Sequence, residues 1–187
     1  VLAVWGGTCV QRGALWWAAH HRHHHLYSDT PRDLHSPKQH GFFHAHMGWI
    51  YDDVDDTDLN RIQDFAKYPE LRFLDRYWAL PPLLLAIGCF LLFGWSGLFI
   101  GFFASTVATW HGTFTINSLA HVWGSRRYET KDTSRNNFWL ALLTLGEGWH
   151  NNHHRYFRSC RQGFFPGELD LTYLALRTLE GFGVVWN

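Results

Sequence analysis

The sequence is short of sulfur and of formal charge. Its 187 residues include three cysteines and one methionine, and charged residues make up only 17% of the chain, against about 25% in ordinary soluble domains. Cys9, Cys89 and Cys160 form no CxxC pair, which excludes a zinc ribbon or an iron–sulfur cluster built on such pairs. The 16 basic residues are balanced by 16 acidic ones. The chain therefore has no basic field for nucleic acid, and we expect no nucleic-acid partner.

A second absence is local. From Tyr77 to Ser125 there are 49 consecutive positions without Asp, Glu, Lys or Arg. A membrane helix needs about 20 apolar residues, so this stretch can hold two, and the Gly-Trp-Ser-Gly segment at 94–97 supplies a turn between them. The sequence predicts a transmembrane helical hairpin over residues 78–114. The alternative is a buried hairpin of a soluble protein, which the repeated Leu, Phe and Trp make less favoured.

Basic residues flank the predicted hairpin on both sides. Arg72 and Arg76 precede it, and Arg126 and Arg127 follow it. Both ends of a hairpin emerge on one side of the membrane, and positive flanks favour the cytoplasm. The expected fold is therefore an all-α integral membrane protein with a lipid bilayer as partner, in which residues 1–77 and 115–187 form a His-rich cytoplasmic cap. Within the cap we expect helices over residues 11–25 and 59–67, and a loop over residues 29–48.

Histidine is the residue in excess, with 14 copies. The pattern HxxHH occurs at residues 21–25 and at residues 150–154, although His20, His23 and His24 also fit it. Positions i, i+3 and i+4 share one helix face, so each copy would point three imidazoles at a common centre. A further histidine, His121, lies four residues after Asn117, on the same face of the helix that leaves the hairpin.

This constellation predicts a metal centre. Seven imidazoles exceed the four ligands of a structural zinc site, so two metal ions are the simpler interpretation. Coordination by nitrogen without thiolate suits iron, although zinc and copper also fit by ligand type alone. A centre at the mouth of an apolar hairpin indicates oxygen chemistry on a hydrophobic substrate, because apolar packing keeps water away from an oxidising centre.

Four segments carry a resemblance to a known family. They are HHRHHHLYSDT at 20–30, GFFHAHMGW at 41–49, NSLAHVWGSRRYE at 117–129 and GEGWHNNHH at 146–154. In order and spacing they resemble the membrane-bound acyl-CoA delta-9 (stearoyl-CoA type) fatty acid desaturases, so that residues 1–187 would be one desaturase domain. The Asn-Asn pair and the SRRYE segment resemble bacterial members. We therefore expect a bacterial inner-membrane protein whose active site faces the cytoplasm.

The resemblance implies an enzyme with four membrane helices that uses two iron ions, O2 and two electrons. It would insert a cis double bond, at delta-9, into a saturated fatty acyl-CoA, with no catalytic residue beyond the metal site. The implied iron ligands are His21, His24, His25, Asn117, His121, His150, His153 and His154. Asn117 would act through water, and Arg22 fixes the register of the first HxxHH copy. Gln11, Trp17 and Thr113 would line the bend of the substrate tunnel, with simple packing as the alternative.

The sequence says less about the residues that surround the ligands and about the source of electrons. Asp29, Asp33 and Glu147 could orient imidazoles by accepting the second ring N–H, with a role at a helix start as the alternative for Glu147. No haem, flavin or iron–sulfur motif is visible in the chain. We therefore expect an external electron donor of the ferredoxin or cytochrome type.

The resemblance has one gap. The family's first histidine pair, in an HRxxSH-like segment, does not occur in this chain, so we expect it upstream of Val1, with the first two membrane helices and two iron ligands. The chain alone is then an incomplete and inactive piece of a desaturase. Two alternatives stay open: a membrane di-iron hydroxylase acting on alkanes or lipids, and a non-catalytic metal-binding remnant.

Overall fold

The computed structural model describes residues 1–52 and 56–186. Over these residues the chain is helical and contains no strand, which confirms the predicted all-α class. Two isolated β-bridges join Asn136 to Ser125 and to Trp149. Contacts divide the chain into two compact units, Val1–Leu26 with Asp52–His111 and Tyr27–Tyr51 with Gly112–Asn187. The single domain over residues 1–187 stays a prediction.

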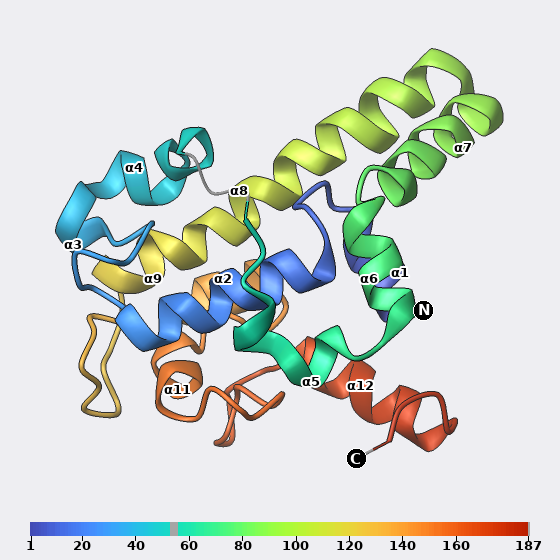
Figure 1. Cartoon of the computed structure of the whole chain (residues 1–187). Helices are drawn as coiled ribbons and strands as arrows, with labels where there is room; N and C mark the ends of the chain where they lie inside the picture. The colour runs from blue at the N-terminus through green and yellow to red at the C-terminus, as the bar shows by residue number, and fades with distance from the viewer. Residues whose placement is uncertain (53–55, 187) are drawn as a thin grey trace. The chain divides into compact units, whose positions relative to one another are not determined.

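The first unit combines the N-terminal helices with the apolar hairpin (Figure 1). Its elements are α1 (Leu2–Gly7), most of α2 (Ala14–Tyr27), η2 (Leu59–Ile62), α5 (Gln63–Ala66), α6 (Pro69–Arg76), α7 (Leu80–Ser96), η3 (Gly97–Ala104) and the first part of α8 (Ser105–Asn117). The small core contains Leu15, Ala18, Ala19 and Ile62, and Leu71 of α6 packs against it. The core thus joins α2 to the helices that lead into the hairpin.

Local signals explain where the first helices begin. The predicted helix at 11–25 begins later, at Ala14, because Arg12 has a positive φ of 64° that ends the preceding turn. The predicted helix at 59–67 is present as η2 followed by α5. The carboxylate of Asp58 accepts a hydrogen bond from the N–H of Asn60 and so caps its start.

The apolar stretch folds back on itself at Gly94. This residue has φ 61° and ψ −149°, a conformation that glycine adopts without strain, and the chain returns through the π-helical η3 into α8 (Figure 1). An added Cβ at Gly97 would collide with the carbonyl oxygen of Cys89, whereas one at Gly101 would lie 3.5 Å from the Cys89 Sγ. The two arms therefore pack more closely at Gly97 than at Gly101.

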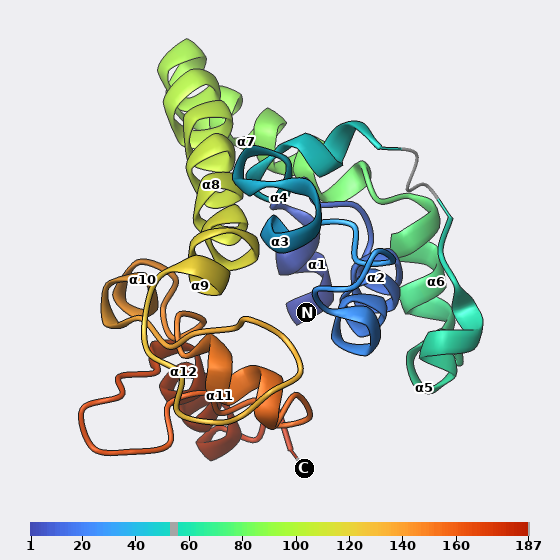
Figure 2. The same ribbon diagram turned by 90° about the vertical axis from the view of Figure 1, so that its left-hand side faces the viewer.

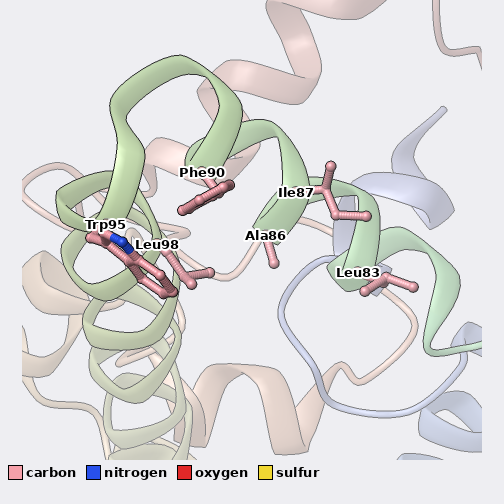
Figure 3. A pocket seen from close by; sticks show the side chains of 6 residues that line it. All are labelled: Leu83, Ala86, Ile87, Phe90, Trp95 and Leu98. Carbon is pink, nitrogen blue, oxygen red and sulfur yellow. The ribbon is translucent and has the colours of Figure 1, made fainter.

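Most of the hairpin surface is apolar and exposed. The helical run Leu80–Val122 is long and apolar enough to cross a membrane, and only 6% of its most apolar window is buried. The run extends beyond residue 114, where the predicted hairpin ends. A shallow apolar pocket on α7 and η3 is lined by Leu83, Ala86, Ile87, Phe90, Trp95 and Leu98 (Figure 3). A soluble protein would have to bury such a surface.

The second unit has its own small core. Its elements are α3 (Pro37–His40), α4 (Phe42–His46), η1 (Gly48–Tyr51), the end of α8, α9 (Leu119–Val122), α10 (Phe138–Leu143), α11 (His150–Arg155) and α12 (Leu171–Gly181). Ile116, Ala120 and Leu140 form the core, and Leu119 packs against it. The backbone before α11 lies on α10, since an added Cβ at Gly148 would collide with Ala141. Figure 2 shows α10, α11 and α12 together in this unit.

The predicted loop over residues 29–48 is wrong in part, because α3 and α4 lie within it. The Ser36 side chain accepts a hydrogen bond from the N–H of Gln39, and Pro37 occupies the first turn of α3. Serine before proline is a strong helix start. This helix start at Ser36 and Pro37 outweighs the glycine and proline content on which the loop prediction rests.

Gly97→Ala should destabilise the hairpin by roughly 1–3 kcal/mol, because the added methyl group must displace the Cys89 backbone. Gly101→Ala is the matched control, since its methyl group makes an ordinary contact and alanine favours the helix. Thermal unfolding of both variants in one detergent measures the difference. Equal melting temperatures would contradict the close packing at Gly97.

Candidate metal centre

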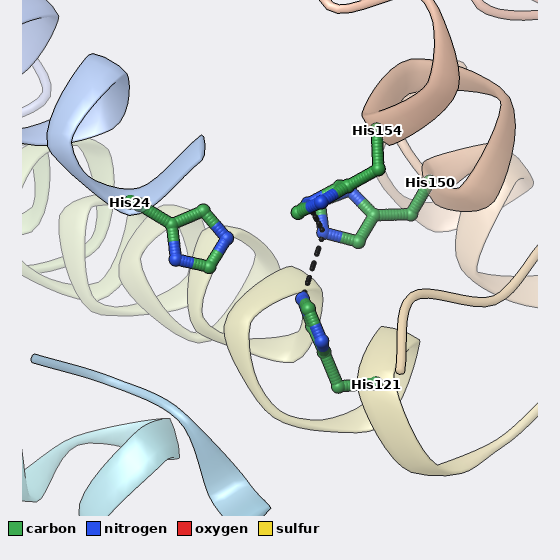
Figure 4. A group of neighbouring side chains, drawn as sticks. All are labelled: His24, His121, His150 and His154. Atoms are coloured by element: carbon green, nitrogen blue, oxygen red, sulfur yellow. Dashed lines mark hydrogen bonds between the residues drawn. The ribbon is translucent and has the colours of Figure 1, made fainter. Parts of the chain in front are cut away.

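Three imidazoles meet in the second unit. His121 of α9 and His150 and His154 of α11 are 3%, 4% and 9% exposed. The Nε2 atom of His150 lies 3.1 Å from Nε2 of His121 and 3.0 Å from Nε2 of His154. Figure 4 shows these three rings converging. One ring nitrogen from each lies within 4.8 Å of those of the other two, so the trio could hold a metal ion.

Oxygen atoms hold the outer nitrogen of two of these rings. The Nδ1 atom of His154 lies 2.8 Å from Oδ2 of Asp132. The Nδ1 atom of His121 lies 3.3 Å from Oγ1 of Thr133 and 3.7 Å from Oδ2 of Asp29. Partners of this kind fix the orientation and tautomer of a metal-binding histidine. Here they turn both Nε2 atoms toward His150.

The hydrogen bonds fix where two protons lie. An ionised carboxylate only accepts hydrogen bonds, so Asp132 requires the proton of His154 on Nδ1. Thr133 donates its hydroxyl proton to Asp29 at 2.7 Å, so its oxygen is free to accept from Nδ1 of His121. In their neutral forms both rings therefore present an unprotonated Nε2.

The two contacts between Nε2 atoms in the trio need two protons to be hydrogen bonds, but the neutral rings supply at most one. A neutral His150 can bring at most one Nε2 proton to its two Nε2 contacts. In one contact, two lone pairs then face each other. A cation bound by the three nitrogens removes the repulsion, and neutral imidazole is the commonest metal ligand in proteins. The residues present thus fit a metal ion.

Asp29 is held as an ionised acceptor. Its Oδ2 accepts from the N–H and hydroxyl of Thr133 at 2.6 and 2.7 Å, and its Oδ1 accepts from the Ser36 hydroxyl at 2.6 Å. Burial alone would raise the pKa of Asp29, but the His121 ring and the two hydroxyl groups hold that pKa well below its usual range. The structure therefore places Asp29 beside an imidazole, as predicted.

The other two predicted acceptors have different positions. Asp33 accepts from the N–H of Asp29 at 2.8 Å and lies 3.8 Å from Nδ1 of His35, which is not a predicted ligand. Glu147 is exposed. Its side chain forms no hydrogen bond with an imidazole among the residues that the structure describes, so the structure does not support its predicted orienting role.

In the first unit, α2 carries the other HxxHH copy. The Nε2 atoms of His21 and His25 lie 3.1 Å apart, one helical turn from each other. His24 is buried on the same helix. The Trp17 ring stacks on the His21 ring, with the ring centres 4.5 Å apart. The helix thus brings His21 and His25 together as the spacing predicts.

The alternative register of this copy is disfavoured. His20 stacks on Trp16 at 4.1 Å, and its Nδ1 hydrogen-bonds to the Trp16 carbonyl at 2.8 Å. His23 accepts a hydrogen bond from the Arg61 guanidinium. Two of the three imidazoles in the register His20, His23, His24 therefore have partners elsewhere.

Four further predicted residues lie outside the trio. Asn117 ends α8, and Ser118, whose backbone angles lie in the right-handed helical region, separates it from α9, which carries His121. Asn117, Gln11 and Thr113 are half-buried. The ring of His153 stacks 5.9 Å from that of His150.

Sequence reasoning misses the residues that hold α11 in place. The side-chain oxygen of Asn136 accepts from the N–H groups of Asn151 and Asn152 at 2.9 and 3.1 Å, and its amide donates to Asn152 at 2.7 Å. Asn151 in turn accepts from the N–H groups of Arg127 and Tyr128 at 2.9 and 2.7 Å. Two asparagines between metal-ligand positions of a short helix are the signal that could indicate such a clamp.

Comparisons place these segments among known proteins. Residues 1–158 match the family model described as "Fatty acid desaturase". A chloroplastic probable lipid desaturase of Arabidopsis thaliana is 38% identical over 191 residues, which cover 100% of this chain and 53% of that protein. An icosanoyl-CoA 5-desaturase of Limnanthes douglasii is 39% identical over 199 residues, covering 99% and 53%.

The chain covers a larger share of a third relative than of the first two. An sn-1 stearoyl-lipid 9-desaturase of Anabaena variabilis is 38% identical over 190 residues, which cover 100% of this chain and 69% of that protein. The chain spans about half the length of the Arabidopsis and Limnanthes relatives.

Asn136→Ala should destabilise the second unit, because it leaves two buried N–H groups at the start of α11 without their acceptor. Each such group costs about 1–3 kcal/mol, so we expect a loss of at least about 2 kcal/mol. Thermal unfolding and hydrogen exchange at Asn151 and Asn152 measure it. The exposed Asn60→Ala is the control, and equal stability of the two variants would contradict the clamp.

Proposed function

The chain belongs to the fatty acid desaturase family, and on that premise we propose that the protein is an oxygen-dependent di-iron desaturase. It inserts a cis double bond, at delta-9, into a saturated acyl chain. The observation that carries this proposal is the convergence of His121, His150 and His154, with the outer nitrogen of two rings held by Asp132 and by Thr133 with Asp29.

We propose that two iron ions are held by His21, His24, His25, Asn117, His121, His150, His153 and His154. The trio in the second unit offers three nitrogens and no thiolate, a donor set that suits iron. His21 and His25 in the first unit offer a further close pair. Bound iron would supply the oxygen activation and redox capacity that removing two hydrogens from an acyl chain requires.

The chain's own residues then set proton positions and exclude water. Asp132 keeps the proton of His154 on Nδ1, and Thr133 does the same for His121, so both rings present Nε2 inward. Burial of the trio keeps bulk water from this point. Trp17 supports the His21 ring by stacking, and we propose that Trp17, Gln11 and Thr113 line the substrate tunnel.

We propose that the hairpin spans the membrane with the cap in the cytoplasm. The small buried share of the apolar run supports insertion, and the arginines at 72, 76, 126 and 127 support the orientation. The bacterial origin stays a prediction, since the relatives named above come from Arabidopsis, Limnanthes and Anabaena.

The carrier of the acyl chain is proposed to be a membrane lipid. The resemblance in sequence predicts acyl-CoA, yet the names of two relatives specify lipid desaturation and that of one specifies a CoA ester. A lipid acyl chain shares the apolar phase of the exposed hairpin, which favours the lipid carrier. O2 is the second substrate, and electrons come from an external ferredoxin or cytochrome-type donor.

His150→Ala should remove both iron and activity from the full-length protein, because His150 contacts both other imidazoles of the trio. Wild-type protein should hold two irons per chain and produce monoenoic lipid in an expression host. The variant should hold at most one iron, with monoenoic lipid at the host background. Metal analysis and fatty-acid profiling measure these outcomes.

The matched control is His44→Ala, whose ring hydrogen-bonds the Leu34 carbonyl at 3.1 Å. It should keep both iron and product. Unchanged monoenoic lipid in the His150→Ala strain would contradict the proposal, and hydroxylated chains in place of double bonds would favour the hydroxylase alternative. Assays on membranes supplied with labelled acyl-lipid or labelled acyl-CoA distinguish the two carriers.

A further inference from the structure

The helix that precedes the hairpin presents two kinds of side chain on one exposed side. Arg72 and Arg76 of α6 are exposed one turn apart, and Phe73 and the following Tyr77 are likewise exposed one turn apart. Leu71 packs on the core of the first unit instead. Because residues four apart stack on a helix, a cationic column and an aromatic column lie side by side on this surface.

Glu70 in the first turn of α6 is exposed, whereas two other acidic groups near this surface are engaged inside the first unit. Asp75 accepts from the N–H of Trp16 at 2.9 Å and from the hydroxyl of Thr57 at 3.4 Å. Asp64 forms a bidentate ion pair with Arg22, in which two guanidinium nitrogens each lie 2.7 Å from a carboxylate oxygen. These carboxylates therefore do not neutralise the exposed arginines of α6.

Two of the three arginines at this surface, Arg76 and Arg12, lie over aromatic rings. The Arg76 guanidinium lies 5.5 Å from the centre of the Tyr77 ring, and that of Arg12 lies 5.3 Å from the centre of the Trp78 ring. Arg72 donates to a backbone carbonyl. Among the residues that the structure describes, neither Arg72 nor Arg76 has an acidic partner. Their positive charge is thus available to an outside anion.

We propose that the exposed side of α6, with Arg12 beside it, binds the headgroups of anionic phospholipids. The apolar run begins at Leu80, three residues after Tyr77, so these cations lie at the point where the chain enters the apolar phase. Exposed aromatic side chains occupy the headgroup level of a bilayer, and arginine reaches lipid phosphates from the same depth. This inference rests on the proposed membrane insertion of the hairpin.

An acidic protein is the other partner that such cations could attract. The lipid is favoured because the surface continues directly into the apolar run and carries exposed aromatic side chains between its charges. Each juxtamembrane cation strengthens binding to anionic lipid by about fivefold.

The test measures lipid selectivity of the full-length protein reconstituted in phosphatidylcholine vesicles. Spin-labelled phosphatidylglycerol and spin-labelled phosphatidylcholine are compared by the fraction of each that the protein immobilises. The wild-type protein should prefer phosphatidylglycerol, and Arg72→Gln with Arg76→Gln should lower that preference by about fivefold for each arginine. The preference of the wild-type protein should also fall as ionic strength rises.

The matched control is Lys131→Gln with Arg158→Gln, which removes two exposed positive charges from the second unit and should keep the wild-type preference. Equal binding of the two lipids by the wild-type protein, or an unchanged preference in the α6 variant, would overturn the inference. Binding of polyglutamate that depends on Arg72 and Arg76, without lipid preference, would assign the surface to a protein partner and overturn it too.

Alkaline carbonate extraction separates this inference from the proposed function. Release of the wild-type chain from membranes would contradict insertion of the hairpin and thus the proposed function itself. Retention of the chain without lipid preference would overturn only the assignment of the α6 surface.

Discussion

The candidate site depends on the two hydrogen bonds that hold protons on the outer nitrogens of His121 and His154. Asp132 fixes one proton, and Thr133, itself tied to Asp29, fixes the other. In their neutral forms both rings then present unprotonated Nε2 atoms to His150. The rest of the second unit positions these partners: Asp132 is held by the N–H of Ser134 at 3.0 Å, and Asn136 clamps the start of α11.

A metal ion held by the trio would add to the stability of the second unit. Buried imidazoles and carboxylates lose hydration, and facing lone pairs add repulsion. A bound cation would offset both costs, because it would bind the folded trio and not the unfolded chain. The carboxylate of Asp29 and that of Asp132 also bring negative charge close to this point. We therefore expect the second unit to be more stable with a metal ion than without one.

Local patterns predict the parts of the fold and site that depend on near neighbours. The spacing of His21 and His25 and of His150 and His154 places each pair one turn apart on a helix, and the uncharged stretch with its glycine turn folds back at Gly94. Long-range contacts escape this reasoning. Asp29 meets Thr133 across 104 positions. Nothing local marks Asp132 or Asn136, because their roles arise only when distant segments pack.

X-ray absorption at the iron edge of the iron-loaded full-length protein tests the central claim most directly. If the trio binds iron through nitrogens whose outer protons are held by oxygen partners, the spectrum should show nitrogen and oxygen neighbours with imidazole scattering and no sulfur. The His154→Ala variant should show fewer imidazoles. A sulfur neighbour in the wild-type protein, or the same number of imidazoles in the variant, would contradict the account.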